Sequence, residues 1–217
     1  MRQIAVLGLS RFGSAVARSL ASMDVEVLGV DLSDEKVADF SKILTHTVQA
    51  DILDEDALDA LGLSDFDVVV LCIKDIEISC LATIALKNHG ARHVVAQASG
   101  DAHAQILEHI GADKVIMPER DMGVRVAKSL SGGNIMDSME LSSTHSLLEM
   151  EVPGEWIGRS LIDCKIRNKY GLNVVAIRSG EELRVSPGGE DVFHPGDVML
   201  VVGENDVLNK FSSRRQK

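Results

Sequence analysis

The stretch VLGLSRFGSAV, residues 6–16, decides which fold this chain can take. It follows an apolar run and leads into residues with apolar side chains at helical spacing, so it predicts a tight turn from a buried strand into a helix. Gly8 permits the turn, and Gly13 opens the helix and lets it pack closely on the strand. The helix N-terminus then offers unpaired N–H groups to a phosphate. The stretch predicts a nucleotide-binding turn in which Ser10 replaces the usual second glycine.

Around this turn, residues 1–118 alternate apolar runs with amphipathic stretches. The stretches 15–23, 35–43, 76–88 and 104–110 carry apolar residues at helical spacing and predict helices. Six apolar runs are typical of strands buried on both faces of a sheet: QIAVLGL, EVLGVDL, HTVQAD, DVVVLCI, HVVAQAS and DKVIMP. The alternation predicts an α/β fold, a Rossmann-like doubly wound parallel sheet that binds ligands at the carboxyl ends of its strands.

The pattern changes after residue 118. Residues 119–133 begin with acidic side chains and end at Gly-Gly, which predicts a connector helix. Further strands are expected in SLLEMEVP, NVVAIRSG, ELRVSP and VMLVVGE, with a helix over 160–169 and a short one from Asn205. We therefore expect a nucleotide-binding domain at 1–118, a connector helix at 119–134 and a smaller α+β C-terminal domain at 135–217.

Composition excludes some function classes. The chain has 217 residues, 45% of them hydrophobic and 25% charged, and its formal net charge of −11 argues against binding to nucleic acid or anionic membranes. Its longest purely apolar run, residues 68–73, is far shorter than a membrane helix, and the N-terminus lacks a signal pattern, so we expect a cytoplasmic protein. Cys72, Cys80 and Cys164 lack the spacing of a disulfide framework or zinc site and predict buried free thiols.

Two charged residues give the turn a chemical preference. Asp31 ends the second predicted strand, where an acid accepts bonds from ribose hydroxyls and disfavours a 2′-phosphate. Arg11 lies inside the turn, where its planar guanidinium suits phosphate oxygens. Ser10 places a Cβ where backbone usually approaches a pyrophosphate, so we expect weakened or altered binding. A plain strand-to-helix turn, with Asp31 as a helix N-cap and Arg11 as a solvated charge, is the alternative.

Over nearly its whole length the sequence resembles the RCK family, also called KTN or TrkA-type: cytosolic regulatory subunits of bacterial potassium-transport systems, here similar to the ring-forming subunits of Ktr transporters. The resemblance implies octameric rings of swapped dimers that bind ATP, ADP or NAD(H) and gate a separate membrane channel subunit at its cytoplasmic face. It also implies that the C-terminal domain is of the TrkA-C type. The segments that carry it are GLSRFG, VDLSDEKV, LEHIGADKVIMPERDMGVRVA, SLIDCKIRNKYGLNVVAI and SPGGEDVFHPGDVMLVVG.

The same resemblance implies a nucleotide site. Relatives often have glycine in place of Lys74 and lysine in place of Gln97, so the number of cations is kept while their positions move. Glu119 is implied to hold a divalent cation, Mg²⁺ or Ca²⁺, that offsets the charge of a triphosphate. The implied residues are Gly8, Ser10, Arg11, Phe12 and Gly13 in the turn, Asp31, Leu32 and Ser33 at the ribose, Asp51 and Ile52 near the base, and Ile73, Lys74, Gln97, Ala98, Ser99, His103 and Glu119 further round.

Four members of this set have a simpler structural interpretation. Lys74 can be a solvated loop charge and His103 a surface histidine of a helix. Asp51 can be the N-cap-like start of DILDEDAL, and Glu119 an ordinary acid in the first turn of a helix.

In the C-terminal domain the resemblance implies a pocket for cyclic di-AMP at a dimer interface. The matching positions are Ile162, Arg167, Asn173, Val174 and Pro187. The same module also occurs where no such ligand binds.

Two other function classes compete. A small NAD-dependent oxidoreductase needs a proton donor in a substrate domain. The only tyrosine, Tyr170, has no lysine four residues later, and the second domain is small, so we expect no enzyme. A nucleotide-binding scaffold unrelated to transport is the third possibility.

Overall fold

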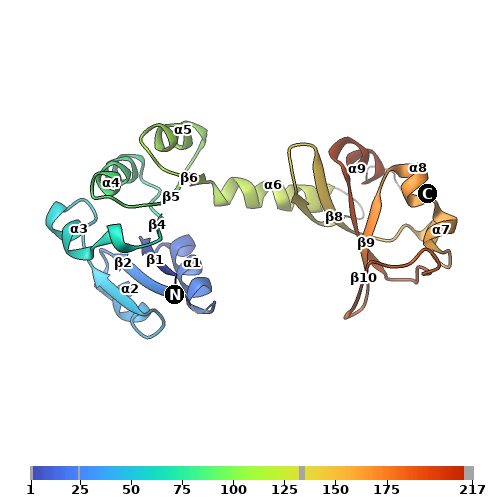
Figure 1. Cartoon of the computed structure of the whole chain (residues 1–217), viewed down its shortest axis with the longest axis horizontal. Coiled ribbons are helices and arrows are strands. Elements are labelled where there is room, and N and C mark those ends of the chain that lie inside the picture. The colour runs from blue at the N-terminus through green and yellow to red at the C-terminus, as the bar shows by residue number, and fades with distance from the viewer. Residues whose placement is uncertain (1, 24, 132–134, 213–217) are drawn as a thin grey trace. The chain divides into compact units, whose positions relative to one another are not determined.

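The computed structural model describes residues 2–23, 25–131 and 135–212 (Figure 1). The chain divides into two compact units, Met1–Glu119 and Arg120–Lys217, and the boundary falls within helix α6 (Pro118–Ser131). The last part of the predicted connector, residues 132–134, lies outside the described residues, as do residues 1 and 213–217 of the predicted domains. Within the described residues, no helix combines the length and apolar character needed to span a bilayer.

The first unit is built on a parallel sheet whose strand order is β3-β2-β1-β4-β5-β6. The order reverses at β1, which pairs with β2 on one side and β4 on the other. The predicted Rossmann-like doubly wound sheet is confirmed, and its switch point lies at the turn after β1. The strands are β1 (Gln3–Leu7), β2 (Glu26–Asp31), β3 (His46–Gln49), β4 (Val68–Leu71), β5 (Val94–Gln97) and β6 (Lys114–Ile116).

Helices pack on both faces of this sheet because its strands are apolar on both sides. Successive residues of β1 point to opposite faces. Val6 packs in one core with Phe40 of α2, and Leu7 packs in the other with Leu86 of α4. The helices are α1 (Arg11–Ala21), α2 (Asp34–Phe40), α3 (Glu55–Leu61), α4 (Ile76–Asn88) and α5 (Asp101–His109), with a 3-10 turn η1 (Leu63–Asp65).

The second unit holds an antiparallel sheet of order β10-β9-β11-β8-β7. The short helix predicted from Asn205 is confirmed as α9 (Asn205–Ser212). It packs on β8 and β11. The sequence does not predict β7, which extends the sheet beyond β8. The strands are β7 (Ile135–Glu140), β8 (His145–Glu151), β9 (Asn173–Ser179), β10 (Glu182–Val185) and β11 (Val198–Glu204).

The single helix predicted over residues 160–169 is wrong. Two short helices, α7 (Leu161–Cys164) and α8 (Ile166–Tyr170), stand in its place. They meet at Lys165, whose φ of 49° lies in the left-handed region and ends the first helix.

The core of the second unit contains an aromatic cluster around Trp156, which follows β8 in the 3-10 turn η2 (Gly154–Trp156). Trp156 is 2% exposed and stacks on Phe193, with ring centroids 6.0 Å apart. The rings of Tyr170 and Phe211 lie 5.6 Å and 5.4 Å from it. These aromatic contacts join η2, α8 and α9 into one core.

The three cysteines are free, as predicted, but they differ in burial. Cys72 and Cys164 are buried, whereas Cys80 is only partly covered. Burial raises the pKa of the Cys72 thiol to about 12, so this thiol stays protonated. The prediction of buried thiols is therefore wrong for Cys80.

Candidate functional site

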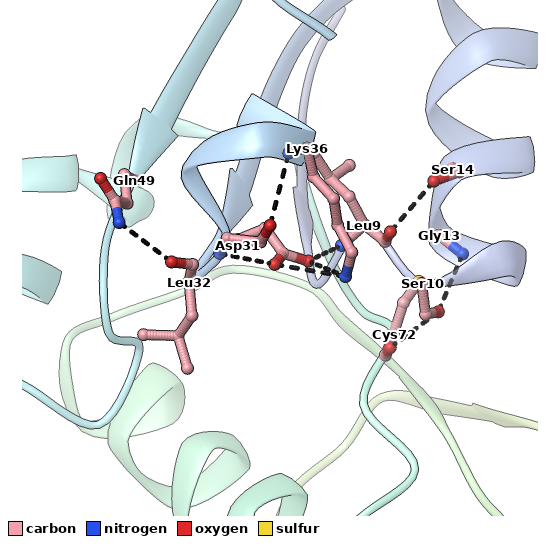
Figure 2. A network of polar contacts seen from close by, with 10 residues as sticks. Leu9, Ser10, Gly13, Ser14, Asp31, Leu32, Lys36, Gln49 and Cys72 are labelled. Carbon is pink, nitrogen blue, oxygen red and sulfur yellow. Dashed lines mark hydrogen bonds and ion pairs between the residues drawn. The ribbon is translucent and has the colours of Figure 1, made fainter. Parts of the chain in front are cut away.

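The turn between β1 and α1 is held by its serine (Figure 2). The Ser10 hydroxyl accepts a hydrogen bond from the Gly13 N–H at 3.4 Å and donates one to the Cys72 carbonyl at 3.3 Å. Ser10 is thus the N-cap of α1, and the helix begins at Arg11. The prediction that Gly13 opens the helix is wrong by two residues, because the serine cap starts the helix earlier.

The two glycines of the turn are required by backbone geometry. Gly8 has a φ of 92°, which side chains rarely adopt. A Cβ at Gly13 would lie 2.0 Å from the Gly8 carbonyl oxygen. The helix N-terminus therefore sits against the end of β1, which is the cradle a dinucleotide turn requires.

Arg11 is the first residue of α1 and is exposed. Within the described part of the chain, it forms no ion pair with a carboxylate. An uncompensated guanidinium at a helix N-terminus adds to the positive end of the helix dipole. The combination suits an anionic group such as a phosphate.

Asp31 ends β2 beside this turn, and its carboxylate is held by three groups of the chain (Figure 2). The Leu9 N–H donates to Oδ2 at 2.7 Å and the Ser33 N–H to Oδ1 at 2.9 Å. The Lys36 ammonium lies 3.0 Å from Oδ2. Burial alone would raise the pKa of Asp31, but the hydrogen bonds from Ser33, Lys36 and Leu9 outweigh it and lower the pKa below its ordinary value.

This network decides between the alternatives for Asp31. The N-cap of α2 is Ser33, so the reading of Asp31 as an N-cap is wrong. The carboxylate is instead a fixed anion with its side chain 10% exposed, next to a lysine that is 45% exposed. Sequence reasoning missed Lys36; the available signal was a lysine in the first turns of the helix after the acid.

The remaining residues of the expected ribose and base region differ in exposure. Leu32 is largely exposed, and its carbonyl accepts a hydrogen bond from the Gln49 side chain at 3.0 Å (Figure 2). Asp51 is exposed and accepts from the Leu53 N–H at 2.9 Å, while the N-cap of α3 is Asp54. The reading of Asp51 as an N-cap is therefore wrong. Ile52 lies in the hydrophobic core, so its side chain is not available to a ligand.

Three more of the expected residues meet at the carboxyl ends of β4, β5 and β6. The Lys74 ammonium forms an ion pair with the Glu119 carboxylate, and both side chains are more than half exposed. The Gln97 side-chain N–H donates to the same carboxylate over a long 3.5 Å. The hydrogen bond from Lys74 lowers the pKa of Glu119. Lys74 is thus not simply a solvated loop charge.

A divalent cation at Glu119 would compete with the Lys74 ammonium group for the carboxylate, and it would have to take its other ligands from phosphate oxygens and water. Mg²⁺ and Ca²⁺ require several oxygen ligands. The described residues contain no group of three or more carboxylate, histidine or cysteine side chains that could hold a metal ion. The one expected ligand, Glu119, already has an ammonium group as its partner.

His103 of α5 is only 2% exposed, so its reading as a surface histidine is wrong. The Ser99 N–H donates to its Nδ1 at 3.1 Å, which places the ring proton on Nε2. Nε2 lies 2.7 Å from the hydroxyl of buried Ser79 in α4. Burial lowers the pKa of His103, although the charge of Asp75 opposes this. His103 therefore fixes the loop after β5, where Ala98 is also buried. Ile73, after β4, is partly buried against the same core.

In the second unit, a cavity of about 250 Å³ lies beside α7 and α8. Ile162, Lys165, Arg167 and Asn168 contribute to its lining. Of the residues expected to bind cyclic di-AMP, Ile162 and Arg167 line it, whereas Asn173, Val174 and Pro187 do not. The cavity therefore brings two cationic side chains to one surface.

A Rossmann-like unit with a phosphate turn, followed by an antiparallel unit, defines a class of two-domain ligand-binding proteins. The model of the TrkA-N domain matches residues 4–118, and that of the TrkA-C domain matches residues 147–215. The chain belongs to this TrkA family, and the resemblance found in its sequence is confirmed.

Two similar proteins are named as potassium uptake proteins. The chain is 39% identical to Ktr system potassium uptake protein C of Bacillus subtilis, over 98% of this chain and 97% of the relative. It is 35% identical to Ktr system potassium uptake protein A of the same organism, over 98% and 96%.

Solved structures share the fold. The GsuK RCK domain, 16% identical, superposes with a TM-score of 0.71 over 97% of this chain and 47% of that chain. The GsuK channel bound to NAD, 14% identical, gives a TM-score of 0.72 over 100% of this chain and 40% of that chain. This chain therefore spans less than half of each of those chains.

Proposed function

We propose that this protein is a cytosolic nucleotide-binding regulatory subunit that gates a membrane potassium channel or transporter subunit. One observation carries the proposal: two separate charged groups lie beside the switch point of the sheet. They are Arg11, which forms no ion pair with a described carboxylate and stands at a helix N-terminus, and Asp31, whose carboxylate is fixed by backbone N–H groups. The relatives named as potassium uptake proteins support the transport role. Their near full-length match supports the same overall domain order.

The ligands proposed are ATP and ADP, or NAD(H). Arg11 and the turn hold the phosphates, and Asp31 accepts from the ribose hydroxyls. Because Asp31 is anionic, a 2′-phosphate on the ribose is disfavoured.

Calorimetry with the full chain tests this assignment. Asp31→Ala weakens NADH and ATP together, because both ligands share the ribose contact. Asp113→Ala is the matched control. The Asp113 carboxylate also accepts hydrogen bonds from a backbone N–H and a lysine, but it lies just before β6, at the amino ends of the strands and away from the proposed site. NADPH binding as tightly as NADH would contradict the role of Asp31.

The switch between ATP and ADP is proposed to depend on Arg11. Two ligands shift a conformational equilibrium differently only through interactions that they do not share, here those of the γ-phosphate. Arg11→Ala lowers ATP affinity by about tenfold to a hundredfold, the range of one charge-assisted contact, and lowers ADP affinity less. Arg18→Ala, near the other end of α1, is the control. Equal losses for both ligands would place the switch elsewhere.

The assembly is proposed to be a ring, octameric and made of swapped dimers, attached peripherally to a membrane subunit on the cytoplasmic side. No catalytic role is proposed: NADH binds without turnover. Purification from membranes with the channel subunit attached supports the transport role. An NADH oxidation activity that copurifies with the chain and disappears in Asp31→Ala would favour the oxidoreductase.

The cavity beside α7 and α8 favours a second ligand, cyclic di-AMP, whose two phosphates match its two cations, Lys165 and Arg167. Cyclic di-AMP raises the melting temperature of the full chain, and Arg167→Ala abolishes the shift. Lys169→Ala, in the same helix but outside the lining, keeps it. No shift in the wild type would remove this ligand and leave the nucleotide site untouched.

A further inference from the structure

The ion pair between Lys74 and Glu119 lies where the expected divalent cation would neutralise the glutamate. Lys74 follows β4 and Glu119 follows β6, so both stand at the carboxyl edge of the sheet, where doubly wound folds bind ligands. A carboxylate at this edge repels the phosphates of a nucleotide unless a cation stands between them. In this chain the cation in contact with Glu119 is an ammonium group.

Gln97 supplies a second observation at the same place. Its side chain is 0% exposed, and one end of the amide points to Glu119. The other end, Oε1, finds no hydrogen-bond partner in the described residues. Because a buried acceptor without a donor is rare in proteins, the amide is held with its N–H₂ end toward Glu119 rather than by a partner at Oε1, and this keeps a donor beside the carboxylate.

We infer that Lys74 serves as the built-in counter-ion of the nucleotide phosphates, in place of a divalent cation. The inference rests on the proposed nucleotide site. In the absence of nucleotide the ammonium pairs with Glu119, and a bound nucleotide brings phosphate oxygens to the same ammonium. Because the charge is carried by a side chain, binding of ATP requires neither Mg²⁺ nor Ca²⁺.

The test compares ATP binding to the full chain in EDTA and in Mg²⁺ or Ca²⁺, by calorimetry. Wild type binds ATP with an affinity that changes less than about threefold between these conditions. Lys74→Gln loses about tenfold or more in EDTA, since Glu119 then faces the phosphates unpaired, and divalent cation restores most of the loss. Lys74→Arg keeps binding in EDTA.

Two further variants sharpen the comparison. Lys87→Gln removes a lysine that forms an ion pair with Asp113 at the amino ends of the strands, and it leaves ATP binding unchanged. Lys74→Gln combined with Glu119→Gln recovers binding in EDTA, because the repelling carboxylate is gone. Melting curves of all variants establish that each is folded.

The outcomes separate this inference from the proposed function. Wild type that binds ATP tenfold or more tightly with divalent cation, or Lys74→Gln that behaves like Lys87→Gln, overturns the inference while the nucleotide site stands. No binding of ATP, ADP or NADH under either condition overturns the proposed function, and the inference falls with it.

Discussion

At the scale of single residues, the hydroxyl of Ser10 stabilises the phosphate turn by joining α1 to the end of β4. Ser10→Ala removes the helix cap and lowers the free energy of unfolding of the first unit by about 1 kcal/mol, whereas Ser10→Gly costs only a few tenths. Hydrogen exchange of the α1 amides measures both changes. A Ser10→Ala variant as stable as the wild type would show that the cap contributes nothing.

His103 gives the first unit a dependence on pH. Its pKa in the folded protein lies below the ordinary value of about 6.5. The unfolded chain therefore binds the proton more readily, and the stability that the neutral ring contributes is lost as pH falls from about 6.5 through the lower folded pKa. The denaturation midpoint, followed by far-UV circular dichroism, falls more steeply in wild type than in His103→Gln over this range. Parallel pH profiles would contradict the role of the neutral ring.

The sequence predicts which charged residues lie at the candidate site better than it predicts which side chains contact them. Asp31 and Arg11 follow from the position of the turn and the strand ends. Lys36, Ser79 and the pairing of Lys74 with Glu119 do not, because each contact depends on the side-chain direction at the end of a loop or helix. Spacing along the chain carries no information about that direction.

At the scale of elements, the apolar runs predict all six parallel strands. The compositional signal is strong for β1, β2, β4 and β5, which are buried on both faces, whereas the expected burial is wrong for the edge strands β3 and β6, which are largely exposed or half-buried. The helix over residues 76–88 is likewise confirmed at both ends. In the second unit the edge strand β7 is missed, since MDSME mixes apolar and charged residues. The break between α7 and α8 is missed because a lysine rarely adopts a positive φ.

That break predicts a stabilising substitution. Lys165 is strained at a φ of 49°, a conformation that asparagine tolerates better. Lys165→Asn raises the free energy of unfolding of the second unit by about 0.5 kcal/mol. Urea denaturation followed by the fluorescence of Trp156 measures it, and Lys169→Asn in α8, which relieves no strain, serves as the control. A loss of stability in Lys165→Asn would show that the lysine makes compensating contacts.

At the scale of the whole molecule, α6 carries exposed apolar side chains that favour association between copies of the chain. Met122, Val124 and Val126 are each about half exposed, and Leu130 is 82% exposed. Apolar residues gathered on one helix indicate an interface. Val126→Glu therefore lowers the molar mass measured by light scattering at micromolar concentration, while Glu108→Gln in α5 leaves it unchanged. A wild type that is monomeric under these conditions would contradict the proposed ring.

The aromatic cluster around Trp156 confines the intrinsic fluorescence of tryptophan and tyrosine to the second unit. The sequence contains one tryptophan and one tyrosine, and both belong to the second unit. Tryptophan emission therefore reports the packing of that unit alone. The first unit contains no tryptophan or tyrosine and contributes no emission from either residue type. This asymmetry is useful: a change in Trp156 emission when ATP occupies the first unit is a spectroscopic record of a signal passing from one unit to the other.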